Sequence, residues 1–134
     1  MNVLVDTSVW SLAFRRDAPR GTAAEEELRE LIGEGRVLML GGIRQELLSG
    51  IRTAEQLKKL RDRLRAFPDM GLSETDYEEA ASCFNRCRSR GVQGSNTDFL
   101  MCAVALRRNA AILTTDGDFA RFSRILQVKL HEPR

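Results

Sequence analysis

Short apolar runs alternate along this chain with longer segments of helical periodicity. Runs with the length of buried strands occur at residues 2–5, 37–40 and 111–113, and a last strand is predicted at residues 126–130. The segment 97–107 is apolar on nearly every side, so we expect a helix in the core there. Strands that alternate with helical segments of crossover length predict a parallel sheet covered on both faces.

Polar residues mark where the other helices begin. Three pairs have capping-box spacing, in which side chains at the first and fourth positions bind free backbone amides. They are Thr22 with Glu25, Thr53 with Gln56, and Ser73 with Asp76. The helices that follow these pairs are predicted at residues 23–32, 54–67 and 74–90. Further helices are expected at residues 7–14 and 43–49, which completes an α/β architecture.

Length and composition favour one folded domain over residues 1–134. The chain is 43% hydrophobic and 30% charged, which is typical of a globular protein. Its longest apolar run, residues 99–106, is far shorter than the roughly 20 residues of a membrane-spanning helix. The N-terminus has Asp6 in its apolar stretch and no basic leader. It does not resemble a secretory signal, so we expect a cytoplasmic protein with no membrane partner.

Neither the cysteines nor the net charge indicates a ligand. Cys83, Cys87 and Cys102 form no CxxC pair and are not near the single histidine, so we interpret them as small buried hydrophobes and expect no zinc site. The net charge of +2 creates no strong field for nucleic acid. Eighteen of the 21 basic residues are arginine, which suits phosphate contacts but is equally consistent with genome composition.

Five acidic residues stand at predicted strand ends or helix starts and form the candidate site. They are Asp6, Glu46, Asp98, Asp116 and Asp118. Each has a purely structural alternative. Asp6 and Asp116 could cap the helices that follow them, and Asp98 could complete a capping box with Ser95. Glu46 and Asp118 could be solvated surface acids.

These acids are expected to converge, because ligands of an open parallel sheet bind outside the carboxyl ends of its strands. Several carboxylates at one edge repel one another unless a cation joins them. Oxygen ligands without histidine or cysteine favour a hard ion, Mg2+ or Mn2+, over zinc. Such an ion activates water and stabilises charge on a phosphodiester, so the acids predict metal-dependent hydrolysis of nucleic acid.

Four short motifs follow one another along the chain. They are Val5-Asp6-Thr7-Ser8-Val9-Trp10, Arg44-Gln45-Glu46-Leu47-Leu48-Ser49-Gly50, Thr97-Asp98-Phe99-Leu100-Met101-Cys102-Ala103 and Leu113-Thr114-Thr115-Asp116-Gly117-Asp118-Phe119. In this order and spacing, over nearly the whole chain, they resemble the PIN-domain ribonucleases, specifically the VapC toxins of bacterial toxin–antitoxin pairs. Each motif is weak alone, and the four together are specific.

The resemblance implies a compact α/β domain with a central parallel sheet of about five strands flanked by helices, and a metal-dependent endoribonuclease activity. The family's catalytic acids correspond to Asp6, Glu46, Asp98 and Asp116. Asp6, Asp98 and Asp116 would bind Mg2+ or Mn2+, and Asp118 is an auxiliary ligand because some relatives lack this acid. Glu46 would bind the metal or orient the attacking water.

The resemblance also implies auxiliary groups and partners. Thr7, Ser8 and Thr97 stand beside the acids and could position water or a phosphate. The partners would be an RNA substrate, a small VapB-type antitoxin held in a groove of helices from the first half of the chain, and a second copy in a homodimer. Candidate residues for RNA phosphates are Arg15, Arg16, Arg44, Arg52, Arg86, Arg88 and Arg90.

Other functions stay open on the sequence. PIN-like folds also occur in flap and repair nucleases of DNA, which carry extra acids and insertions that this short chain lacks. A catalytically silent RNA-binding module is the alternative from another class, and the cost of clustered charge argues against it. A HAD-type phosphatase is disfavoured, because its DxD follows the first strand, whereas Asp116-Gly117-Asp118 lies near the C-terminus.

Overall fold

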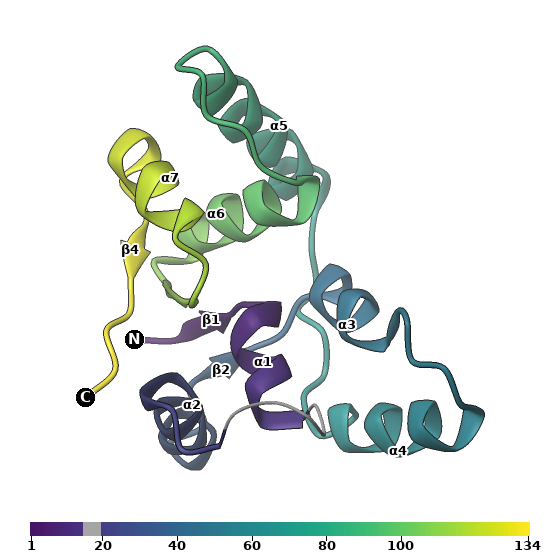
Figure 1. Ribbon diagram of the computed structural model, residues 1–134. Coiled ribbons are helices and arrows are strands. Elements are labelled where there is room, and N and C mark those ends of the chain that lie inside the picture. The colour runs from purple at the N-terminus through teal and green to yellow at the C-terminus, as the bar shows by residue number, and fades with distance from the viewer. Residues whose placement is uncertain (15–19) are drawn as a thin grey trace.

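A computed structural model of the chain describes residues 1–14 and 20–134 (Figure 1). Four strands form one parallel sheet, and they are β1 (Val3–Val5), β2 (Val37–Leu38), β3 (Ala111–Leu113) and β4 (Lys129–Leu130). Their order across the sheet is β2-β1-β3-β4. β1 is therefore central, paired on both sides, and its three residues are fully buried.

Seven helices flank the strands in the part of the chain that the structure describes. They are α1 (Thr7–Phe14), α2 (Ala23–Gly33), α3 (Gly41–Leu48), α4 (Ala54–Leu64), α5 (Glu74–Arg88), α6 (Asn96–Arg108) and α7 (Asp118–Leu126). Helices α5, α6 and α7 lie on one side of β1 and β2, and α1 and α2 on the other (Figure 1). Within residues 1–14 and 20–134, none of the helices has the length and apolar character that a membrane crossing requires.

The predicted α/β class with a parallel sheet is confirmed, and the four observed strands are close to the number expected. The predicted helix starts are also confirmed at two caps, because Thr22 and Thr53 each accept a backbone N–H at 3.2 Å. The ends are less accurate. Helices α4 and α5 stop at Leu64 and Arg88, where tight turns begin, before the predicted residues 67 and 90.

The C-terminal segment differs from the prediction of a strand over residues 126–130. A helix, α7, occupies Asp118–Leu126 and buries Phe119, Phe122 and Leu126 in the core. It ends because Gln127 adopts a left-handed conformation with φ of 63°. The last strand therefore starts at Lys129, and α7 is an element that the sequence analysis missed.

An aromatic cluster joins α5, α6 and α7. Phe99 contacts Phe84 and Phe122 at ring-centroid distances of 5.4 and 4.9 Å, and Phe122 contacts Phe119 at 5.1 Å. Gly94 lies directly against the cluster, since a Cβ there would be 2.6 Å from Cζ of Phe122. Only glycine fits this position. The close approach fixes the loop that leads into α6 against the core.

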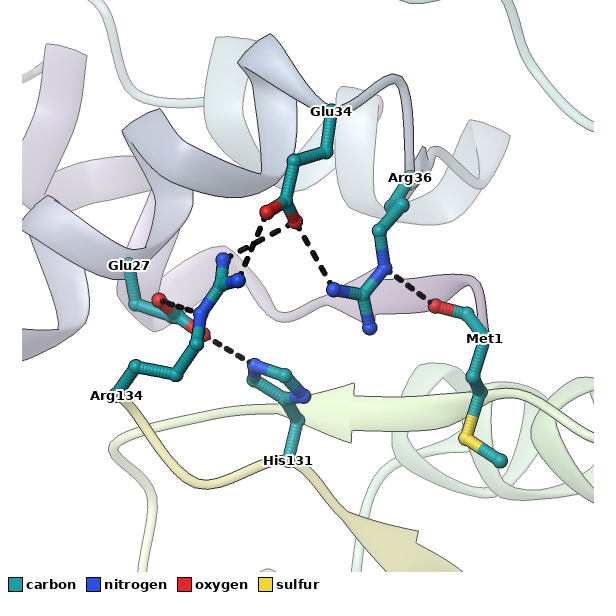
Figure 2. A network of polar contacts seen from close by, with 6 residues as sticks. All are labelled: Met1, Glu27, Glu34, Arg36, His131 and Arg134. Atoms are coloured by element: carbon teal, nitrogen blue, oxygen red, sulfur yellow. Dashed lines mark hydrogen bonds and ion pairs between the residues drawn. The ribbon is translucent and has the colours of Figure 1, made fainter.

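The two termini are fixed to α2 by a network of charged groups (Figure 2). The buried Glu27 contacts His131 Nε2 and accepts from Arg134 Nε at 3.2 Å. Arg134 also donates to Glu34 at 2.8 Å, and Arg36 links Glu34 to the backbone carbonyl of the first residue. Burial raises the pKa of Glu27, but hydrogen bonds from His131 and Arg134 outweigh it, so the pKa is lowered.

A buried carboxylate connects α5 to α6. Asp76 is 0% exposed, accepts from Arg108 Nη1 at 2.9 Å and forms an ion pair with Arg107, whose Nε lies 2.9 Å from its Oδ1. It also accepts from Ser73 N at 2.8 Å, as the predicted capping box requires. The Arg108 hydrogen bond, followed by the Ser73 N–H, holds the pKa of Asp76 well below its usual range. The end of α6 is thereby fixed to the start of α5.

We expect Asp76→Asn to lower the free energy of unfolding by roughly 2–3 kcal/mol at pH 7, because a neutral amide weakens the charge-assisted bond from Arg108 and loses the ion pair with Arg107. The folded-state pKa is lowered, so this stabilisation is complete above the unfolded pKa and is lost as the pH falls towards the folded value. Urea unfolding should therefore show the parent and variant converging below about pH 4. Glu74→Gln, an exposed acid in the same turn, is the matched control and should unfold like the parent. Equal stability of parent and Asp76→Asn at pH 7 would contradict this role.

Candidate active site

The pairing of β1 with β3 places Asp6 beside Thr114. The strands are parallel and Val5 lies opposite Leu113, so the residues that follow them meet at the same edge of the sheet. Asp6 N donates to Leu113 O at 2.9 Å, which extends the pairing past the end of β1. The position of the first candidate acid is therefore set by the sheet itself.

The Asp6 side chain is held by three hydrogen-bond donors. Asp6 is 7% exposed, and its Oδ1 accepts from Thr7 N at 2.8 Å. Its Oδ2 accepts from Ser8 Oγ at 2.9 Å and from Thr114 Oγ1 at 2.7 Å. Of these three bonds, only the one from Thr7 N fits the alternative role of Asp6 as a cap of α1. The two hydroxyl donors satisfy a buried carboxylate that would otherwise be costly to desolvate.

Asp98 lies in the first turn of α6. Only Asn109 and Ala110 separate this helix from β3, so α6 runs back along the strand and begins at the carboxyl edge of the sheet. The capping-box alternative is confirmed, because Asp98 Oδ2 accepts from Ser95 N at 2.9 Å and Asp98 N donates to Ser95 Oγ at 3.0 Å. The residue still has a second carboxylate oxygen for other contacts.

Two other candidate acids contribute to the electrostatic surroundings of Asp98. Burial raises the pKa of Asp98, and the negative charges of Asp6 and Asp116 raise it further, against the lowering effect of the Ser95 hydrogen bonds. Burial is the larger cause, and the smaller effect of the two charges means that Asp6 and Asp116 lie within the range of charge interactions, roughly 10 Å, of Asp98. We call Asp6, Asp98 and Asp116 the acid cluster, and their assignment to one metal site stays a prediction.

Asp116 and Asp118 follow β3 on the loop into α7. Asp116 N donates to Thr114 Oγ1 at 2.9 Å, and Asp116 Oδ1 accepts from Asp118 N at 2.9 Å. Asp116 thus binds the first backbone N–H of α7, as its structural alternative requires, although the N-cap position itself is Gly117. Asp118 is exposed in the first turn of the helix. Its assignment as an auxiliary ligand stays a prediction.

Glu46 is exposed on α3 but is not simply solvated. Its Oε1 accepts from Thr7 Oγ1 at 2.9 Å, across 39 positions of sequence. Since the backbone N–H of Thr7 donates to Asp6, this residue connects the two acids through its own two donors. The fourth family acid is therefore fixed beside the first.

The three auxiliary polar residues have different surroundings. The hydroxyls of Thr7 and Ser8 donate their protons to Glu46 and Asp6, so they orient these acids and have no proton left for a phosphate. Thr97 lies against the start of α3, where a Cβ at Gly42 would be 3.4 Å from its Oγ1. The beginnings of α3 and α6 therefore meet close to the acids.

Thr114 is the residue of this site that the sequence analysis missed. Its hydroxyl donates to Asp6 and accepts from Asp116 N. Its place in the chain could have indicated its role, because Thr114 follows β3 as Asp6 follows β1. Using that signal requires the strand register, which the sequence alone does not supply.

The acids of the site differ from the other paired carboxylates of the protein in their partners. Asp76, Glu27, Glu34 and Asp62 all pair with arginine, lysine or histidine, and their pKa values are lowered. The ion pairs in residues 1–14 and 20–134 include none of Asp6, Glu46, Asp98 or Asp116. Their bonds come from backbone amides and hydroxyls, which leaves the negative charge unbalanced.

This donor set fits a hydrated hard cation. No three histidine, cysteine or acidic side chains of the described residues are arranged to hold a metal as they stand. Mg2+, however, usually keeps several waters and contacts only one or two carboxylates directly. The cluster of Asp6, Asp98 and Asp116 offers oxygen ligands and an unbalanced negative charge, so these residues could hold Mg2+ or Mn2+.

The candidate arginines are not equivalent. Arg15 and Arg16 lie outside the described residues. Arg44 is occupied in the fold, because it donates to Asp69 at 2.8 Å and to the carbonyl of Leu64 at 3.0 Å. The exposed candidates are Arg52, Arg86, Arg88 and Arg90.

The interpretation of the three cysteines as small buried hydrophobes is confirmed. Cys83, Cys87 and Cys102 are each 0% exposed and unpaired as disulfides. Burial raises the pKa of Cys83 to about 11 and also raises the pKa values of the other two thiols. Protonated, inaccessible thiols are unreactive.

Comparison with known proteins matches the PIN domain family over residues 3–125. Two relatives, VapC ribonuclease Mb1587 of Mycobacterium bovis and ribonuclease VapC11 of Mycobacterium tuberculosis, are each 30% identical to this chain over 131 residues. Each match covers 95% of this chain and 96% of the relative. The matched range of residues 3–125 spans the positions of all the candidate acids.

Solved structures show the same fold at lower identity. FitAcB from Neisseria gonorrhoeae has a TM-score of 0.76 at 20% identity, over 98% of this chain and 97% of the other. VapBC2 from Rickettsia felis, solved with a promoter DNA fragment, has a TM-score of 0.78 at 18% identity, over 98% of each chain. The arrangement of helices around the parallel sheet is thus shared with these proteins.

We expect Asp98→Asn to melt at the same temperature as the parent or higher, measured by calorimetry at pH 7 in EDTA. The amide oxygen can still accept from Ser95 N, while one negative charge leaves a cluster in which the charged form of Asp98 is disfavoured. Asp98→Ala, which loses the cap as well, should instead be less stable by about 1 kcal/mol. A large loss of stability in Asp98→Asn would mean that charge repulsion at this site is negligible.

Proposed function

Because the chain belongs to the PIN domain family of VapC ribonucleases, we propose that it is a metal-dependent endoribonuclease and the toxin of a toxin–antitoxin pair. The relatives' names supply the RNA substrate class. The metal requirement is argued from the acids of this chain.

The observation that carries the proposal is the cluster of Asp6, Asp98 and Asp116 at the carboxyl edge of the sheet. The charges of Asp6 and Asp116 help to raise the pKa of Asp98, and none of the three carboxylates has an ion-pair partner among the described residues, so their arrangement is costly unless a cation joins them. A fold with no need for the cation gains nothing from this arrangement. A metal-binding role supplies a reason for all three residues.

The residues have distinct roles in this proposal. Asp6, Asp98 and Asp116 hold Mg2+ or Mn2+, directly or through water, with Asp118 as an auxiliary ligand. The bound ion supplies the charge that activates water and stabilises the phosphodiester during in-line displacement. Thr97, which lies against the start of α3, would contact a phosphate of the substrate. The ribose 3′ oxygen is the leaving group.

Glu46 orients the attacking water and accepts its proton. Its Oε1 is fixed by the Thr7 hydroxyl at 2.9 Å, which limits the rotation of the carboxylate. The other oxygen, Oε2, belongs to an exposed residue and can receive a proton from water. A general base needs a fixed position and an accessible oxygen, and Glu46 has both.

The partners follow from the same family membership. A VapB-type antitoxin would occupy the groove between α3 and α4, which is lined by Leu48 and Leu57 and bordered by Arg44 and Arg61. Solved relatives include toxin–antitoxin assemblies, which supports this partner. We also propose that the toxin acts in the cytoplasm as a homodimer. RNA phosphates would contact the exposed candidate arginines.

The test is cleavage of total cellular RNA and of single-stranded DNA by the purified, antitoxin-free chain. We expect cleavage of RNA with Mg2+ or Mn2+ and none in EDTA. Asp116→Asn keeps the acceptor for Asp118 N but loses the charge, and it should reduce the rate by roughly 100-fold or more, since even outer-shell partners of a metal account for 10- to 100-fold. Asp62→Asn, an exposed acid on α4 paired with Lys58, is the matched control and should cleave like the parent.

The outcomes separate the remaining functions. Cleavage of DNA in place of RNA would support a repair-type nuclease. The absence of any cleavage by a folded, antitoxin-free protein, with every metal tested, would overturn the enzyme proposal in favour of a silent RNA-binding module. Cleavage that persists in EDTA would overturn the metal requirement alone.

A further inference from the structure

Two hydroxyl groups lie between the Asp6 carboxylate and the loop that carries Asp116. Thr114 Oγ1 donates to Asp6 Oδ2 at 2.7 Å and accepts from Asp116 N at 2.9 Å. Ser8 Oγ donates to the same Oδ2 at 2.9 Å and accepts from Thr115 N at 3.1 Å. Each hydroxyl thus commits its single proton to Asp6 and a lone pair to the backbone of the loop.

The hydrogen bonds form two short chains, and each chain runs from a backbone N–H through a hydroxyl to the same oxygen of Asp6, Oδ2. A hydroxyl that accepts from an amide is a stronger donor, so each backbone N–H strengthens the bond from its own hydroxyl to Oδ2. Asp6 is 7% exposed, and the hydroxyls therefore take the place of water at this oxygen. In the described structure Oδ1 has Thr7 N as its donor, which leaves it the oxygen with more acceptor capacity.

The same contacts connect two strands of the sheet. Asp6 follows β1, and Asp116 is on the loop after β3. Thr114 joins them, because its hydroxyl donates to the Asp6 carboxylate and accepts from the backbone N–H of Asp116. Asp116 Oδ1 in turn accepts from Asp118 N at 2.9 Å, where α7 begins. Rotation of the Asp6 carboxylate would therefore break bonds on both sides of the site.

From this geometry we propose that Thr114 and Ser8 are positioning residues that set the Asp6 carboxylate, relative to Asp116, for binding a divalent cation. The inference rests on the proposed metal site and adds two residues that act through the acids. Neither hydroxyl needs to contact the metal or RNA. Without them, the Asp6 side chain would keep one donor, Thr7 N, and could rotate away from the cluster.

The test is Mn2+ binding to the full-length chain, measured by calorimetry in the absence of RNA. Thr114→Val keeps the shape of the side chain and removes the hydroxyl, and we expect it to weaken Mn2+ binding by about 10- to 100-fold. Thr114→Ser restores the hydroxyl and should restore the affinity. Thr75→Val, the same change at an exposed position of α5, is the control and should bind Mn2+ like the parent.

Two further measurements separate positioning from folding. Ser8→Ala should weaken Mn2+ binding on its own and should not be additive with Thr114→Val, because both hydroxyls donate to one oxygen. In RNA cleavage, Thr114→Val should lower kcat and raise the Mn2+ concentration for half-maximal rate, with KM for RNA unchanged. Ser8→Ala also keeps the test decisive if Thr114→Val fails to fold.

The outcomes distinguish this inference from the function on which it rests. If the parent binds Mn2+ and both hydroxyl variants bind it equally well, the positioning role is wrong and the metal site stands. If Thr114→Ser is as weak as Thr114→Val, the methyl group and packing matter and the hydroxyl does not, which also overturns the inference. If the folded parent binds no Mn2+, the proposed metal site fails and the inference fails with it.

Discussion

The parallel pairing of β1 with β3 is the constraint on which the candidate site depends. Val5 lies opposite Leu113, so Asp6 and Thr114 must be neighbours at the carboxyl edge of the sheet. The segments on either side of β3 bring the other two acids of the cluster. Helix α6 leads into the strand and begins with Asp98, and the loop out of it carries Asp116. A slip of one residue between the two strands would turn alternate side chains to the opposite face and separate the acid from its hydroxyl donors. The full burial of β1 opposes such a slip.

Two kinds of carboxylate are held in this fold by different means. Glu27 and Asp76 are buried, away from the site, and each is matched by arginine or histidine, so their charges are neutralised where they stand. The acids of the site receive N–H and O–H dipoles only. Dipoles can orient a carboxylate and satisfy its lone pairs, but they do not cancel its charge. This difference explains why the pKa of Asp76 is lowered and that of Asp98 is raised, although both complete a capping box in the first turn of a helix.

Local rules account for what the sequence predicts well. Capping pairs, apolar runs and the direction of parallel strands are properties of short segments, and they are sufficient to place three helix starts, three strands and the acids at one edge. The errors lie where long-range contacts or single backbone angles determine the structure. Gln127 ends α7 by a left-handed φ of 63°, which no local pattern indicates. The roles of Thr114 and of Thr7 depend on partners 108 and 39 positions away. Such contacts follow from strand register and helix packing, which are global properties of the fold.

The structural and chemical roles of the acids are compatible, because each acid uses one carboxylate oxygen for the backbone. Asp6, Asp98 and Asp116 accept from the amides of Thr7, Ser95 and Asp118, at or beside the starts of α1, α6 and α7. Capping by itself therefore does not separate a structural acid from a functional one. Charge does. The positive end of a helix dipole is equivalent to about half a unit charge, so three helix starts offset only about half the charge of three carboxylates. The remainder is close to what one divalent cation would neutralise, and none of the ion pairs among the described residues supplies it. The helix starts therefore make it possible to assemble the acids without a metal, and they leave the net negative charge that a metal requires.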